Sequence, residues 1–305
     1  MTLHRRVSAF VAATCITLWM CVAHAQTPNQ HGPKVLVVDA HPDDEGAYAA
    51  TIYKLTHDLH GTVDLAVITN GEGGYKYSTL AEAYYGLELT DEKIGRENLP
   101  RIRKQELMNA GKILGVRNYF FLDQRDNHYT LNPHEVLDSV WNVPMVEQRL
   151  HELLIVGRYD YLFCVMPYDS THGHHKAATI LALRAVAALD ASNRPIILAG
   201  GLGYADSTKR FVRLNDYPIT EIDTAKPVLT FDRGVHFGYH NVLTYKMIVD
   251  WATMEHKSQG TLRPLGPNDN TEWFYFFKLN DPSRYAQAQE LFRQLAVLHF
   301  VTKTY

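Results

Sequence analysis

The chain has 305 residues, of which 46% are hydrophobic and 21% charged, and its formal net charge at pH 7 is −3. This composition is ordinary for a globular protein with one large domain or two small ones. The balance of charge offers no basic surface for a phosphate backbone, so we expect no nucleic-acid partner.

The first 25 residues differ in character from the rest of the chain. Arg5 and Arg6 precede a mostly apolar stretch at residues 7–22, and residues 23–25 (AHA) place small side chains at the two positions that a signal peptidase reads. This order is typical of a secretory signal peptide, cleaved before Gln26. We therefore expect an exported protein that is periplasmic or extracellular.

Two alternatives concern the same segment. The apolar stretch is short for a membrane span, which favours cleavage over an uncleaved anchor. Cys21 suggests lipid attachment, but the bulky residues 18–20 stand where small ones are expected. We therefore expect a mature chain that starts with a short polar tail at residues 26–33 and has no membrane span.

Strand-like and helix-like segments alternate from residue 34 to about residue 200. Compact apolar runs predict buried strands, and longer segments that end at Gly or another breaker predict helices. The expected strands are residues 34–39, 63–69, 119–122, 161–166 and 195–199, and the expected helices are residues 43–59, 94–114, 146–156 and 174–190. Pro100 lies inside the second of these helices and predicts a break or a first turn there. The alternation predicts an α/β fold whose mostly parallel sheet has helices on both faces.

The last third of the chain does not continue this alternation. The expected strands are residues 218–222, 228–231 and 272–279, and the expected helices are residues 239–256 and 283–300. No internal repeat or low-complexity linker separates this part from the rest. We therefore expect a single domain over residues 34–305, with a C-terminal α+β elaboration from about residue 200.

A first cluster of reactive side chains follows the strand at residues 34–39. Residues 40–45 (AHPDDE) hold one imidazole and three carboxylates. Ligands bind outside the carboxyl ends of parallel strands, and so much charge beside a buried strand needs compensation, which a divalent cation would supply. His41 and Asp44 can converge on Zn²⁺ or another divalent metal, whereas Asp43 is free to act as a general base. The alternative is an acidic N-cap that favours the helix dipole.

A second cluster, residues 172–175 (HGHH), follows the fourth expected strand and opens a helix. Since two strand ends of one sheet can lie close together, this cluster can supply the third metal ligand, and three protein ligands leave room for water and substrate. A remaining histidine would serve as a general acid or as an electrostatic partner of the tetrahedral intermediate. Solvated surface histidines are the alternative.

Polar residues elsewhere are candidates for substrate binding. Glu72 lies in the loop after the second expected strand, Arg103 lies on the expected helix at residues 94–114, and Asp126 follows the third expected strand. A salt bridge is the alternative for Arg103, and loop capping is the alternative for Asp126.

The two clusters together resemble the PIG-L/LmbE-like family of deacetylases. The likeness runs from about residue 34 to about residue 260. The motifs that carry it are residues 40–45 (AHPDDE), 69–73 (TNGEG), 103–106 (RKQE), 114–116 (LGV), 172–177 (HGHHKA) and 256–259 (HKSQ).

The resemblance implies a role for each matched position. His41, Asp44 and His175 would bind zinc, Asp43 would be the general base on the metal-bound water, and His172 would stabilise the oxyanion or protonate the leaving amine. It also implies a Rossmann-like fold and the hydrolysis of an N-acyl group, in the first place N-acetyl, from an amino sugar or a related amine conjugate.

One position departs from the family. The family has Asp where this chain has His174, and that Asp helps to orient the first histidine of the motif. A neutral imidazole accepts a hydrogen bond but would polarise His172 less, so the acid role of His172 is the least secure of the implied roles.

Other functions fit parts of the same pattern. The histidine at position 174 favours a metal- or sugar-binding protein that has lost catalysis, and the clusters are also compatible with a metallohydrolase that acts on another amide or an ester. A nucleotide-binding oxidoreductase is disfavoured because the first strand is not followed by a Gly-x-Gly-x-x-Gly turn. A small molecule or a glycan is thus the expected partner, and the sequence leaves the oligomeric state open.

Overall fold

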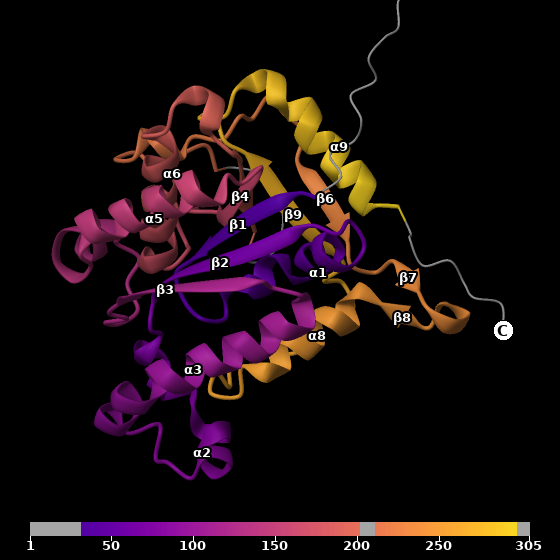
Figure 1. The fold of residues 1–305 in the computed structure, drawn as a ribbon. Coiled ribbons are helices and arrows are strands. Elements are labelled where there is room, and N and C mark those ends of the chain that lie inside the picture. The colour runs from indigo at the N-terminus through magenta and orange to yellow at the C-terminus, as the bar shows by residue number, and fades with distance from the viewer. Residues whose placement is uncertain (1–31, 202–210, 298–305) are drawn as a thin grey trace, which may run out of the picture. The chain divides into compact units, whose positions relative to one another are not determined.

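A seven-stranded sheet forms the centre of residues 32–201 and 211–297, which are the parts of the chain described by the computed structural model (Figure 1). The strands are β1 Lys34–Asp39, β2 Thr62–Thr69, β3 Asn118–Gln124, β4 Tyr161–Val165, β5 Ile196–Gly200, β6 Leu229–Asp232 and β9 Thr271–Phe276. Their order across the sheet is β3-β2-β1-β4-β5-β9-β6. The first five strands are parallel, and β9 runs antiparallel to both β5 and β6.

Helices cover both faces of the sheet. They are α1 Ala49–His57, α2 Thr79–Tyr85, α3 Glu92–Leu114, α4 Pro133–Glu135, α5 Val143–Gly157, α6 Gly173–Ala187, α8 Tyr245–Glu255 and α9 Tyr285–Leu295. Buried side chains of α1, α3, α8 and α9 join one apolar core, and those of α5 and α6 join the other. Figure 1 shows α3 and α8 on one side of the strands and α5 and α6 on the other. The predicted α/β class, with a mostly parallel sheet between helices, is confirmed.

Strand β1 shows why the sheet is buried on both faces. Val35 and Val37 point into the core that contains α1, and Leu36 and Val38 point into the core that contains α6. All four side chains are at most 1% exposed. A continuous apolar run, rather than an alternating one, is the pattern that two covered faces require.

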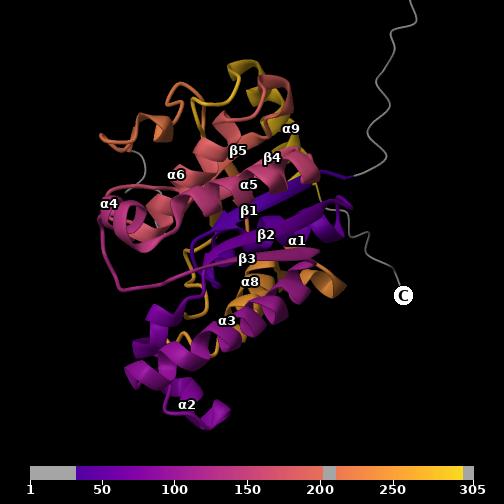
Figure 2. The same cartoon turned by 60° about the vertical axis from the view of Figure 1, so that its left-hand side comes forward.

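Short elements complete the fold. A two-stranded antiparallel hairpin consists of β7 His236–Phe237 and β8 Leu243–Thr244. The 3₁₀ turns are Asp44–Tyr48, Glu72–Tyr77, Ala191–Asn193, Pro218–Thr220, Tyr239–Asn241 and Pro282–Arg284, and a π-helical turn spans Val136–Val140. Helix α2 lies beyond α3, at the side away from the sheet (Figure 2).

The break predicted at Pro100 is wrong, because α3 continues through this residue over 23 residues. A proline inside a helix costs about 3 kcal/mol. Burial of Leu99 and Ile102 on either side of it, and of Leu107 further along, offsets that cost. Tertiary packing therefore overrides the local signal.

Three other expectations need correction. The strand expected at residues 218–222 is a 3₁₀ turn, Pro218–Thr220, and Ile222 makes only an isolated bridge to Phe277. The helix expected from residue 43 starts as the 3₁₀ turn Asp44–Tyr48, and the one expected from residue 239 starts at Tyr245. The stretch before Tyr245 instead contributes to the β7–β8 hairpin, where Gly238 has a positive φ of 75°.

The predicted signal peptide and most of the polar tail lie outside the described residues. The described residues, 32–201 and 211–297, belong to one compact unit. Among the residues that the structure describes, no helix is both long enough and apolar enough to cross a membrane.

Candidate active site

The two clusters meet at the point where the strand order of the sheet reverses. Strands β1 and β4 are parallel neighbours, with Val38 paired to Cys164. From β1 the chain next forms β2 on one side, whereas from β4 it next forms β5 on the other side. Such a switch point opens a crevice at the carboxyl ends of the strands. The loop after β1 therefore brings His41 to the residues that open α6.

Three side chains in this crevice have the geometry of a metal site. His41, Asp44 and His175 each offer one ligand atom, and these atoms lie within 4.8 Å of one another. His41 Nδ1 is 3.0 Å from His175 Nε2, and the Asp44 carboxylate is 3.5 Å from the first nitrogen and 3.0 Å from the second. The structure thus brings together all three predicted ligands.

The turn after β1 orients the Asp44 carboxylate. Asp44 Oδ2 accepts hydrogen bonds from the backbone N–H groups of Ala40 and His41, at 3.0 and 2.8 Å. Oδ1 faces His175. The backbone therefore fixes Oδ2, which also lies near His41, and directs Oδ1 toward His175.

The charges of the three groups depend strongly on one another. Burial opposes a charge on His41, but Asp44 and the other nearby carboxylates outweigh it and raise the pKa of His41 to about 9. Burial would also raise the pKa of Asp44, but His175 and His41 hold that pKa well below its ordinary value. Two imidazole nitrogens and one carboxylate oxygen form the donor set that suits Zn²⁺ and similar divalent cations.

Asp43 does not belong to the group of three candidate ligands and forms an ion pair with Arg103 instead. Its Oδ1 is 2.8 Å from Arg103 Nη2, and both side chains line the central cavity. Arg103 is only 3% exposed, and its Nη1 donates to the Gly71 carbonyl at 2.6 Å. Gly71 has a positive φ of 72°, and a Cβ at this position would lie 2.4 Å from Arg103 Nη1. The glycine thus allows the guanidinium to reach Asp43.

His172 lines the same cavity as Asp43. Its Nδ1 accepts the backbone N–H of His174 at 3.1 Å, and its Nε2 is 3.4 Å from the Thr130 nitrogen. Burial lowers the pKa of His172 to about 3, and the nearby His41 and His175 add to the effect. Both ring nitrogens therefore face backbone N–H donors, and a neutral imidazole accepts at only one of them.

The cavity has a volume of about 890 Å³ and contains most of the predicted site. Of the predicted substrate contacts, Arg103 and Asp126 line it. Glu72 is half-buried in the adjacent loop and is not among the lining residues, and burial raises the pKa of its carboxyl. The substrate role of all three residues stays a prediction.

Several lining residues were missed by the sequence analysis: Tyr75, Lys76, Tyr77, Arg96, Arg125, His128, Tyr129, Gln259 and Leu262. Residues 75–77 directly follow the loop motif at residues 69–73, and residue 259 closes the motif at residues 256–259. Proximity to a motif was thus the only available signal, because these side chain types are common on any surface.

The described residues also explain motif positions to which no role was assigned. Glu45 Oε1 is 2.6 Å from His256 Nε2, and both side chains are 1% exposed. Glu106 accepts from the Ser258 hydroxyl at 2.6 Å and from the Tyr85 hydroxyl at 2.7 Å. The late motif at residues 256–259 therefore connects the end of α8 to the first loop, through Glu45, and to α3, through Glu106.

Comparison with known proteins agrees with this geometry. A family model described as PIG-L, GlcNAc-PI de-N-acetylase, matches residues 36–186, which include both clusters. The chain belongs to the PIG-L family. The predicted family is thereby confirmed, and with it the deacetylase class of hydrolase.

Two curated PIG-L relatives come from bacilli. A probable N-acetyl-alpha-D-glucosaminyl L-malate deacetylase 2 from Bacillus cereus is 26% identical over 253 residues, which cover 80% of this chain and 97% of the relative. The protein of the same name from Bacillus subtilis is 26% identical over 161 residues, which cover 53% of this chain and 64% of the relative. Among solved structures, the A40926 pseudoaglycone deacetylase Dbv21 aligns with a TM-score of 0.50 and 16% identity, over 81% of this chain and 97% of that one. The structural match supports the shared fold.

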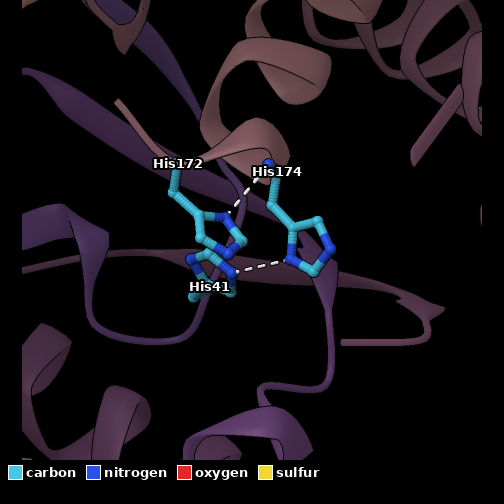
Figure 3. Close-up of side chains that lie close together, drawn as sticks. All are labelled: His41, His172 and His174. Atoms are coloured by element: carbon cyan, nitrogen blue, oxygen red, sulfur yellow. Dashed lines mark hydrogen bonds between the residues drawn. The ribbon is translucent and has the colours of Figure 1, made fainter. Parts of the chain in front are cut away.

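His174 is the position that departs from the PIG-L motif. Its side chain contacts the candidate ligand His41, with His174 Nδ1 3.0 Å from His41 Nε2, and its backbone N–H donates to His172 Nδ1 (Figure 3). The expected weaker polarisation of His172 stays a prediction. The contact of the His174 ring with His41 was not foreseen from the sequence.

Proposed function

We propose that this chain is a zinc-dependent hydrolase that removes an N-acyl group, in the first place N-acetyl, from an amino sugar or a related amine conjugate. The observation that carries the proposal is the convergence of His41, Asp44 and His175 beside Asp43, which is not one of the three converging donors. Three protein ligands with open positions, next to a free carboxylate, form the arrangement that metal-assisted amide hydrolysis needs.

Zinc is our choice among divalent metals because of the donor set. Two imidazole nitrogens and one carboxylate oxygen match the ligands of catalytic zinc sites, although other divalent metals tolerate the same donors. When bound, the cation supplies Lewis-acid polarisation of the scissile carbonyl and a lower pKa for attacking water.

Asp43 is the general base in this proposal. Its carboxylate lines the cavity at 16% exposure and is held through one oxygen by Arg103. The other oxygen is then free to accept a proton from the attacking water. A positioned base of this kind contributes about 10²- to 10⁴-fold to the rate.

His172 supports the carbonyl oxygen as negative charge develops on it. In this proposal the His172 imidazole, which lines the cavity, is the hydrogen-bond donor to that oxygen. A fixed donor stabilises the charge of the transition state more than that of the ground state. The amine leaves with the proton that Asp43 has taken from water.

The substrate class follows from the relatives and from the cavity. The names of both curated relatives describe an N-acetylated glucosamine conjugate as their substrate. A cavity of about 890 Å³ holds a sugar together with the group to which it is linked, and Arg103 and Asp126 offer polar contacts for sugar hydroxyls.

The test is acetate release from a panel of N-acetylated amino sugars and glycosides. The purified chain should release acetate, lose this activity after treatment with a strong chelator, and regain it with one equivalent of Zn²⁺. Activity that survives complete metal removal would contradict the proposal. Metal binding without release from any amide would favour a binding protein, and release from esters alone would favour the other hydrolase class.

We also propose that the protein is exported, periplasmic or extracellular. The proposal rests on the sequence of residues 1–25, with two arginines before an apolar stretch and small residues at positions 23 and 25. N-terminal sequencing of the protein from its native host should start at Gln26. A mature chain that starts at Met1 in the cytoplasm would contradict export.

A further inference from the structure

His174 is buried among groups that use both of its ring nitrogens. The side chain is 0% exposed and its ring lies 5.3 Å from the Trp141 ring, centroid to centroid. Nδ1 is 3.0 Å from His41 Nε2, and Nε2 is 2.8 Å from Asn127 Oδ1. Figure 3 shows the His174 ring directed toward His41, with His172 beside them. The ring therefore links the candidate metal ligand to the loop after β3.

Glu135, which contacts Asn127, determines the direction of these hydrogen bonds. Asn127 Nδ2 donates to Glu135 Oε1 at 3.1 Å, and an ionised carboxylate only accepts. The amide oxygen of Asn127 is therefore the atom that faces His174, so His174 Nε2 carries the proton and donates it. The neutral imidazole then offers a lone pair at Nδ1.

The same logic fixes the protonation of His41. Because His174 Nδ1 accepts, the 3.0 Å contact requires His41 Nε2 to donate. The other nitrogen of His41, Nδ1, faces Asp44 and His175, and it gives its lone pair to a metal ion once that ion has displaced the proton on Nδ1. This is the nitrogen that belongs to the candidate metal site.

One neighbouring group competes with this arrangement. Asp126 Oδ1 lies 3.4 Å from His174 Nδ1 and would accept a proton from it. That choice would leave His174 Nε2 without a proton, so its lone pair would face Asn127 Oδ1 at 2.8 Å. Two acceptors at that distance repel each other, and the shorter contacts at both ring nitrogens favour the first arrangement.

We propose that Glu135, Asn127 and His174 form a positioning relay that holds His41 in the tautomer with Nδ1 free for the metal ion. The proposal rests on the metal site of the proposed function. A metal-ligating histidine is generally held by an acceptor at its other nitrogen, and loss of such an acceptor typically weakens metal binding about 10- to 100-fold. In this chain the acceptor is a neutral imidazole, which requires a further partner to fix its own tautomer.

The decisive comparison is between two substitutions at one position. His174→Asn keeps an oxygen near the place of Nδ1 and can accept from His41, whereas His174→Leu is similar in size and accepts nothing. Zinc affinity, measured by competition with a chromophoric chelator, should stay within about threefold of the native value for the Asn variant and fall about 10- to 100-fold for the Leu variant. His174→Asp should bind zinc at least as tightly as the native chain.

A second measurement does not depend on a variant that must fold. Nitrogen NMR of the histidine side chains in the zinc-loaded native chain should show His174 protonated at Nε2 and His41 protonated at Nε2. His174 protonated at Nδ1 would overturn the relay. In Asn127→Leu, which removes the fixed acceptor, a signal from the Nδ1-protonated form of His174 should appear.

The outcomes separate the relay from the proposed function. A native chain that binds no zinc would refute the metal site, and the function with it. A native chain that binds zinc, together with equal affinities for the Asn and Leu variants, would refute the relay and leave the function standing. Melting temperatures of both variants, measured without metal, show whether a lost affinity reflects unfolding.

Discussion

The buried pair of Glu45 and His256 allows a quantitative test of how the metal loop is held. The two side chains are 2.6 Å apart and each is 1% exposed, so solvent does not screen them. Glu45→Ala leaves His256 Nε2 without its partner, and breaking a buried pair in this way costs about 3–5 kcal/mol. At about 2 °C per kcal/mol for a chain of this size, the melting temperature should fall by roughly 6–10 °C.

Glu45→Gln is the matched control, because its amide oxygen still accepts from His256. A hydrogen bond to a neutral acceptor is weaker than one to a charged acceptor by about 1 kcal/mol, so this variant should lose roughly 2 °C. Thermal melts and urea titrations in chelator provide both values without a contribution from bound metal. Equal losses for Ala and Gln would refute the assigned contact.

The same pair predicts a pH dependence. Burial opposes the charge of His256, but Glu45 outweighs it and raises the pKa of His256 above its ordinary value. A group whose pKa is higher in the folded state stabilises fully below its unfolded pKa, about 6.5, and this contribution is lost as pH rises through the folded pKa. The native chain should therefore exceed Glu45→Gln in stability by more at pH 6 than at pH 9. A difference that grows with pH would contradict the account.

Three further substitutions test separate parts of the structure. Asp43→Asn should reduce turnover at least about 100-fold while zinc affinity stays within a few-fold, and loss of zinc instead would show that the base and ligand roles are misassigned. Arg103→Lys cannot hold both Asp43 and the Gly71 carbonyl, so kcat should fall about tenfold with unchanged zinc affinity, and an unchanged kcat would remove Arg103 from the positioning of the base. Gly200→Ala places a Cβ 2.0 Å from Tyr48 Cε1 in the core, so calorimetry should show a loss of about 1–3 kcal/mol, and native stability would contradict this packing.

The sequence was sufficient for the central sheet because each parallel strand is a short apolar run between clear breakers. Residues 34–39 are predicted to the residue, and the other parallel strands differ from their predicted bounds by at most two residues at either end. The convergence of the two clusters was also predictable, since both follow strands and strand ends of one sheet share an edge.

The C-terminal third was less predictable for a physical reason. Its strands pair antiparallel with distant partners, and residues 218–222 are apolar enough for a strand but become a 3₁₀ turn because tertiary contacts decide between the two. Helix α3 shows the same override at Pro100. Local propensity is a weak signal wherever burial can compensate for it.

The contacts between side chains within the site could not be predicted from the sequence, for another reason. The motif places His174 next to His172 in the chain, but a residue at the start of a helix points its ring in a different direction from that of its neighbours. The His174 ring reaches His41, 133 residues away in sequence. Glu45 and His256, 211 residues apart, are a second example.

A zinc-edge anomalous difference map from crystals grown with one equivalent of Zn²⁺ tests the central claim most directly. The account predicts one peak per chain, bonded to His41 Nδ1, one oxygen of Asp44 and His175 Nε2 at about 2.0–2.2 Å. It also predicts that Asp43 is near the peak but not bonded to it. A peak held by His172 and His174, or no peak between β1 and α6, would contradict the account.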